Sequence, residues 1–303
     1  MKNNKLALAT LSALAAQVIF GFSFMFTKIA LNYSTPMTVI ANRYMVAFLG
    51  MTAVMCATKT KIKIGKNIWK LLLMSVFQPL LYFIFESYGI KMTTSAFSSI
   101  MISLIPVVAM ISGIFLLNEK PLFSQYVFTA ISVFGVIITA LIGKSDGTVT
   151  TIGIILLFGA VLSSAAYNIL SRKISGEFTV FERTYVMTLV GLVFFFGISF
   201  TENIDNPAKI FTPFLSAPYT VSILYLGIVS SVIAFMFLNF ANTYLPVAKT
   251  TVFSNLTTVV SVIAGAVFLN EKISSVSILA VVMIIAGVFG VQVIGVRKNN
   301  SLI

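Results

Sequence analysis

Glu86 is the acidic residue of this chain that lies inside a long apolar run. The other seven of the eight acidic residues fall in stretches that we expect to be loops or turns. Gln78 and Tyr82 precede Glu86 at helical spacing, so the three side chains would share one face of a helix. A charge in such surroundings is costly, which makes an embedded carboxylate a candidate for function. We expect this face to line a cavity.

Arg43 is the second charged residue within an apolar run. It lies about two helical turns after Pro36, at a depth comparable to that of Glu86. Two interpretations stay open. The residues could form a fixed ion pair that joins two helices, or they could face a cavity and bind a charged substrate group or a proton. Because arginine stays protonated, proton coupling would fall to Glu86.

Other polar side chains could contribute to the same site. Hydroxyl groups along 246–269 more often mediate helix packing than ligand binding. Five aromatic residues could line the cavity and accept an apolar group, namely Phe20, Phe24, Tyr82, Phe85 and Tyr167. The candidate substrate-binding residues are Arg43, Glu86, Tyr82, Gln78, Gln17, Asn168, Asn239 and Asn255.

The composition places these residues in a membrane protein. The chain is 58% hydrophobic and 9% charged, whereas a soluble domain carries roughly 25% charged residues. With no histidine and a single cysteine, Cys56, we expect no disulfide framework, no metal centre and no cofactor. We attribute the net charge of +12 to membrane topology rather than to nucleic-acid binding.

The apolar runs predict ten membrane-spanning helices, since a bilayer core needs about 20 residues per helix. The segments are 6–31, 36–57, 67–90, 93–117, 121–143, 152–171, 180–201, 217–241, 246–269 and 274–296. An N-terminus in the cytoplasm places fourteen Lys and Arg residues on the inner side and five on the outer side. Basic residues favour the cytoplasmic side, so we predict a cell-membrane protein with both termini inside.

A repeated turn indicates that the chain is duplicated. The sequence Leu117-Asn118-Glu119-Lys120 returns as Leu269-Asn270-Glu271-Lys272, with matching glycines and valines on both sides. We therefore predict one repeat over 1–146 and a second over 147–303. Five helices is an odd number, so the repeats would have inverted topology, which is typical of transporters with a central site.

The chain resembles the EamA-type ten-helix members of the drug/metabolite transporter superfamily over nearly its whole length. The resemblance implies an all-α bundle of ten helices, with a central cavity lined mostly by helices 1–4 and 6–9. Phe20 replaces the tryptophan usual in the family, and Thr258 matches the position of Pro106, so no proline kink is expected there. The matching residues are Phe20-Gly21-Phe22-Ser23-Phe24, Lys28-Ile29-Ala30, Arg43, Tyr44, Tyr88-Gly89-Ile90-Lys91, Thr93-Thr94-Ser95-Ala96, Pro106, Gly135-Val136, Tyr167-Asn168, Ser171-Arg172-Lys173 and both Asn-Glu-Lys turns.

The function implied by this resemblance is secondary transport of small organic metabolites, such as amino acids or amines, with export as the direction. No Gly-x-x-x-x-Gly-Lys-Ser/Thr loop is present, so we expect a gradient to drive transport. A channel and a lipid-modifying enzyme are the alternatives. The expected partners are a small-molecule substrate, the lipid bilayer and a proton as coupling ion, but not nucleic acid; a homodimer is left open.

Overall fold

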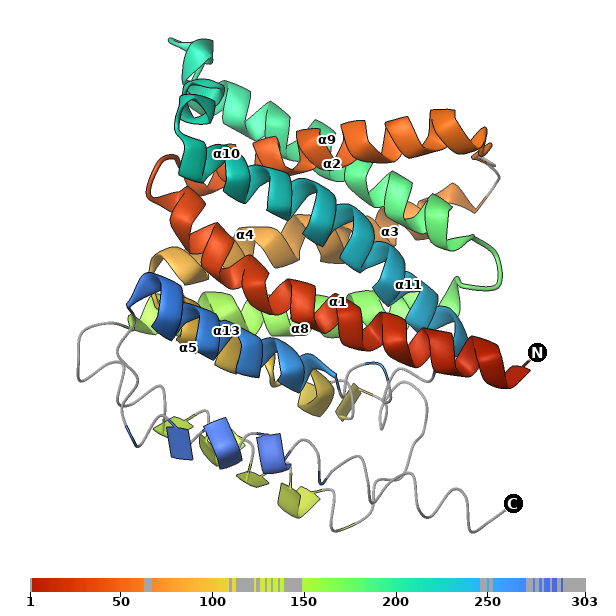
Figure 1. Ribbon diagram of the computed structural model, residues 1–303, viewed down its shortest axis with the longest axis vertical. Coiled ribbons are helices and arrows are strands. Elements are labelled where there is room, and N and C mark those ends of the chain that lie inside the picture. Colours follow the sequence, from red (N-terminus) through yellow and green to blue (C-terminus); the bar gives the residue numbers. More distant parts are fainter. Residues whose placement is uncertain are drawn as a thin grey trace.

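The computed structural model describes residues 2–62, 67–108, 149–245, 250 and 253–270, with scattered positions between 111 and 138 and between 275 and 290. All regular elements in this part of the chain are helices (Figure 1). They are α1 (Lys2–Leu31), α2 (Pro36–Thr58), α3 (Ile68–Ser75), η1 (Val76–Leu81), α4 (Tyr82–Lys91), α5 (Ser95–Ile102), α8 (Thr151–Lys173), α9 (Val180–Glu202), η2 (Pro207–Ile210), η3 (Thr212–Leu215), α10 (Ala217–Leu224), η4 (Tyr225–Ala234), α11 (Phe235–Tyr244) and α13 (Ser254–Leu269).

Six helical stretches are long and apolar enough to cross a membrane. They are Asn4–Leu31, Pro36–Thr58, Ile68–Lys91, Thr151–Lys173, Val180–Glu202 and Ala217–Tyr244, and Ser95–Val108 and Leu256–Leu269 are shorter apolar helices. Large apolar side chains such as Leu8 and Val193 point outward, as expected of a surface that faces lipid. The chain is therefore a multi-pass, all-helical membrane protein. The predicted segments 121–143 and 274–296 lie mostly outside the described residues, as do Glu119, Lys120, Glu271 and Lys272.

Threonine side chains cap the N-termini of α2, α5, α8 and α9 and explain where these four helices begin. Thr35 accepts a hydrogen bond from the Thr38 backbone at the start of α2. At the start of α9, Thr179 and Glu182 form a reciprocal capping box. The expectation that Glu182 lies in the loop before this helix is therefore wrong, because it occupies the third helical position.

The third membrane span is not the continuous helix predicted over 67–90. It consists of α3, the π-helical segment η1 and α4, and Gln78 has the non-helical backbone angles φ −147° and ψ 112°. The cause is Pro79, which disfavours the helical region for the residue before it and has no N–H to donate. The span Ala217–Tyr244 also contains a π-helical segment, η4, between α10 and α11.

The helices form a bundle in which α1 occupies a central position. Figure 1 shows α13 and α5 on one side of α1 and α2 and α9 on the other. In this bundle α2 packs on α9, α4 packs on α8, and α1 packs on α13, α11 and η4. Loops that we predict to share a membrane side meet at the same end: Lys28 donates to the Ile90 carbonyl, and Thr35 donates to Glu202.

Two glycines of α9 give a direct test of this packing. A Cβ at Gly191 would overlap the ring of the fully buried Tyr44 on α2, whereas a Cβ at Gly197 would have no neighbour within 4 Å. We expect Gly191→Ala to destabilise the protein by about 1–3 kcal/mol through overpacking. Gly197→Ala should be neutral or stabilising by up to about 1 kcal/mol, because alanine favours helix. Thermal unfolding in detergent would measure both; equal midpoints would contradict the α2–α9 interface.

Candidate substrate cavity

A narrow cavity lies among the helices of both halves of the chain. It offers about 50 Å³ to the centres of water molecules, and one water needs about 10–15 Å³. In this conformation it has room for a few waters. Its lining residues are Gln17, Phe20, Ser23, Phe24, Arg43, Gln78, Tyr82, Phe83, Glu86, Ile102, Ile105, Ser164, Asn168, Ser230, Phe235, Leu238, Thr250, Ser254 and Thr257.

Glu86 lines this cavity together with Gln78 and Tyr82, although the helix is broken between them. The Glu86 side chain is 5% exposed, and its Oε1 accepts a hydrogen bond of 2.9 Å from the Tyr82 hydroxyl. Its Oε2 is buried and has no hydrogen-bond partner among the described residues, and the same holds for Oε1 of Gln78. The three residues thus form an acceptor-rich wall.

Arg43 reaches the cavity from α2 and is held by the second half of the chain. Its Nε donates to Ser231 Oγ at 2.7 Å, and its Nη2 donates to Ser230 Oγ at 2.9 Å. Ser23 on α1 also donates to Ser230, at 2.9 Å. The guanidinium lies 4.2 Å from the centre of the Phe83 ring, a cation–π contact. Arg43 therefore joins α2 to η4 and to α4.

Arg43 and Glu86 share the cavity without forming an ion pair. In the part of the chain that the structure describes, the ion pair present joins Lys70 to Glu177. Of the two open interpretations, the geometry fits cavity-facing groups, because the fixed pair is not formed.

The remaining predicted polar residues divide into two groups, the first of which lines the cavity. Gln17 Oε1 accepts a hydrogen bond of 2.7 Å from the Thr257 hydroxyl on α13. Asn168 donates to the Ser164 carbonyl at 2.9 Å and accepts from Asn242 Nδ2 at 3.1 Å. Both amides thus already have partners within the protein.

Asn239 belongs to the second group and does not line the cavity. Its Oδ1 accepts from the Tyr167 and Ser171 hydroxyls, and its Nδ2 donates to Thr184 Oγ1 at 3.0 Å. This saturated network joins α8, α9 and α11. The side chain of Asn255 lies outside the described residues, so its predicted role stays a prediction.

The predicted aromatic lining is divided in the same way. Phe20, Phe24 and Tyr82 line the cavity. Phe85 packs against Gly159 of α8 instead, and Tyr167 is fully buried in the Asn239 network.

Two arginines at one end of the bundle are bound to helix ends. Arg183 is fully buried, and its Nη1 and Nη2 donate to the carbonyls of Ser171 and Asn239, each at 3.0 Å. Arg172 donates to the Asn242 carbonyl at 3.0 Å. Ser171 and Asn242 lie in the last turns of α8 and α11, where carbonyls carry partial negative charge, so these helix ends stabilise the two cations.

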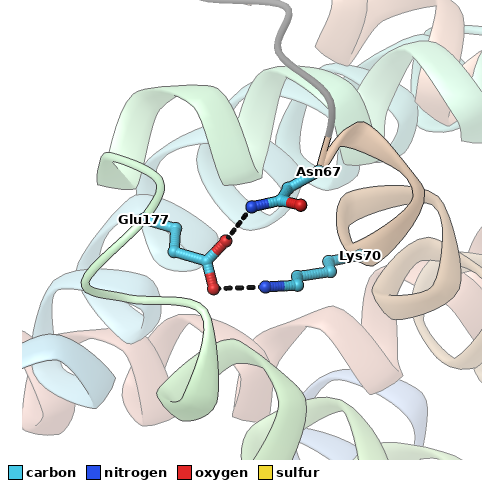
Figure 2. Close-up of polar contacts among 3 residues, drawn as sticks. All are labelled: Asn67, Lys70 and Glu177. Carbon is cyan, nitrogen blue, oxygen red and sulfur yellow. Dashed lines mark hydrogen bonds and ion pairs between the residues drawn. The ribbon is translucent and has the colours of Figure 1, made fainter.

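A surface contact joins the two halves at the same end (Figure 2). Glu177, in the loop between α8 and α9, accepts a 2.8 Å hydrogen bond from Asn67 and an ion-paired hydrogen bond from Lys70 on α3. The bond from Lys70 lowers the pKa of Glu177 below its usual value, so the carboxylate stays ionised at neutral pH. Water screens such an exposed pair, so we assign it a role in orienting the two segments.

Several residues that line the cavity or hold Arg43 were not predicted from the sequence. Ser230 and Ser231 hold Arg43, and Phe83 covers its face. Two adjacent serines inside an otherwise apolar run are a signal that could have identified the partners of an embedded arginine. Phe83 carried no signal, because one phenylalanine among 28 does not stand out.

The family profile of the EamA-like transporter family matches residues 7–141 and again residues 151–293. The chain belongs to the EamA-like transporter family. The resemblance inferred from the sequence motifs is thereby confirmed, and the cavity lies within a transporter fold.

Individual relatives agree with this membership. The uncharacterized transporter YcxC of Bacillus subtilis (strain 168) is 31% identical over 286 residues, which cover 93% of this EamA-like transporter and 92% of that protein. A probable amino-acid metabolite efflux pump of Escherichia coli (strain K12) is 22% identical over 295 residues, with 96% of each chain covered. A solved crystal structure matches the fold with a TM-score of 0.66 at 16% identity, covering 96% of this chain and 98% of that chain.

The hydrogen bonds of Arg43 give a testable prediction for the cavity wall. Ser231→Ala removes the acceptor of Arg43 Nε and leaves a buried charged donor without a partner. We expect a loss of about 1–3 kcal/mol in the free energy of unfolding, measured by thermal unfolding in detergent. The matched control is Thr10→Ala, which removes an exposed hydroxyl bonded within its own helix. An equally small effect of both variants would contradict this role of Ser231.

Proposed function

We propose that the chain is a secondary active exporter of small organic metabolites, such as amino acids or amines, and that it works by alternating access. The observation that carries the proposal is Glu86, a buried carboxylate in a cavity walled by helices from both halves, with one oxygen that has no partner among the described residues. Such a group can bind a substrate charge or a proton and change its partner as the halves move. The Escherichia coli relative, named a probable amino-acid metabolite efflux pump, supports the substrate class and direction.

We further propose ten helices in two inverted repeats, over 1–146 and 147–303. Two features support the repeat. The third span and the span Ala217–Tyr244 both contain a π-helical segment, at corresponding positions of the repeats. Helix contacts also come in matching pairs: α4 packs on α8 as α11 packs on α1, and α5 packs on α8 as α13 packs on α1. The α2–α9 contact would then lie on the pseudo-two-fold axis.

The proposed orientation in the cell membrane has both termini in the cytoplasm. Arg172, Arg183 and Lys70 lie at the end of the bundle that this orientation places inside. Cytoplasmic accumulation of Lys and Arg supports it. The contact between Glu177 and α3 would then link the two halves on the cytoplasmic side, where an inward-opening movement would separate them.

The inverted repeat is tested by topology reporters fused after Lys120 and after Lys272. Because the two turns occupy equivalent positions in oppositely oriented repeats, we expect the first reporter to be cytoplasmic and the second to be external. A pair of enzymes that are active on only one side of the membrane would measure this. Reporters that both read the same side would reject inverted topology.

Proton coupling through Glu86 is tested by Glu86→Gln in proteoliposomes loaded with a mixture of amino acids and small amines. Under an imposed pH gradient, solute loss followed by mass spectrometry should fall about tenfold or more relative to the wild-type protein. Glu202→Gln, at the exposed end of α9, should transport like the wild type. Unchanged flux in Glu86→Gln, at equal folded protein, would reject the coupling role.

A further inference from the structure

The polar groups of the cavity are unequally supplied with partners. The partners of Gln17, Asn168, Ser23, Ser230 and Arg43 all lie within the protein. In contrast, Oε2 of Glu86 and Oε1 of Gln78 are buried and have none among the described residues. Glu86 and Gln78 are each 5% exposed, and both line the cavity. Both buried side-chain atoms of the cavity lining that have no partner among the described residues are therefore acceptors.

The positive charge near these acceptors belongs to Arg43, whose side chain is fixed by its contacts with the protein. Arg43 donates from Nε and Nη2 to the two serines of η4, and its guanidinium lies over the Phe83 ring. It is held in the cavity wall by these contacts, and no ion pair forms between it and Glu86 in the described part of the chain. An anionic ligand would have to approach a carboxylate and a second acceptor, whereas a cationic donor would satisfy both.

The apolar part of the lining suits the rest of such a ligand. Phe20, Phe24, Phe83 and Phe235 contribute aromatic surface next to the acceptors. Aromatic faces attract organic cations and also bury apolar groups. The cavity thus combines a negative, acceptor-rich wall with an aromatic wall.

We propose that this cavity binds organic cations that carry a primary ammonium group, whose N–H groups donate to Glu86 Oε2 and to Gln78 Oε1. The proposal rests on the proposed function, since it names the substrate class of the same site. Glu86 supplies the charge selection. Gln78 supplies selection for N–H donors, because a quaternary ammonium has no hydrogen to give to an amide oxygen.

The test uses four probes that share a phenylethyl group: phenethylamine, trimethyl(2-phenylethyl)ammonium, N-acetylphenethylamine and 3-phenylpropionate. Binding to the purified full chain in detergent is measured by isothermal titration calorimetry at neutral pH. We expect phenethylamine to bind about tenfold more tightly than the trimethyl compound, and the neutral and anionic probes to bind more weakly than both.

Two variants separate the two acceptors. Glu86→Gln should weaken phenethylamine binding about tenfold or more, and Gln78→Leu should abolish the preference for phenethylamine over the trimethyl compound. Glu202→Gln is the control with wild-type affinities. The melting temperature of each variant without ligand verifies folding, and Gln78→Leu alone decides the donor preference if Glu86→Gln unfolds.

Tighter binding of 3-phenylpropionate than of phenethylamine would overturn the proposal, as would wild-type affinity for phenethylamine in Glu86→Gln. Failure of all four probes to bind, with transport of other solutes in proteoliposomes intact, would overturn the ligand class and leave the transport function standing. Selective binding of phenethylamine without transport of any solute would support the ligand class and overturn the transport function.

Discussion

A guanidinium ion inside a membrane protein must have partners, and this requirement organises the centre of the molecule. Arg43 lies on α2, and its partners are two serines of η4 and the face of Phe83 on α4. These elements are far apart in the chain, and one buried cation brings them together. Its guanidinium is held by hydroxyl groups and an aromatic ring, and the carboxylate of Glu86 forms no ion pair with it in the described part of the chain. The cavity keeps an acid because the arginine is bonded elsewhere.

The need of buried polar groups for partners also separates the structural polar groups of the interior from the candidate binding groups. The Asn239 network and the arginines at the ends of α8 and α11 bond to hydroxyls, amides and carbonyls of their neighbours. Such saturated clusters hold helices together in lipid, where water is absent. Glu86 and Gln78 depart from this pattern, each with one buried oxygen that has no partner among the described residues. Of the five buried side-chain atoms that have no partner among the described residues, these two lie on residues that line the cavity, and the other three lie on Asn42, Tyr44 and Asn242, outside its lining.

Sequence reasoning found the six long spans that the structure describes and the embedded charges, because long apolar runs and isolated ionisable residues are local properties. It placed Glu86, Arg43, Gln78, Tyr82, Gln17 and Asn168 at a cavity, and the structure brings these six together. It misplaced Asn239, since the rotation of a helix about its axis depends on neighbours that an apolar run does not reveal. The break in the helix at Gln78 was not predicted, although a proline at position 79 disfavours helical backbone angles at the residue before it. The capping box at Thr179 and Glu182 was also readable, because its spacing is local.

The narrowness of the cavity has an energetic consequence. Space for a few waters cannot hold an organic metabolite, so a ligand must bind a wider member of the conformational ensemble. The apparent affinity of the ligand is then its intrinsic affinity multiplied by the fraction of protein molecules in that wider form. A form populated at about 1% lowers the apparent affinity about 100-fold. A substitution remote from the cavity that favours the wider form would therefore tighten binding without adding any contact to the ligand.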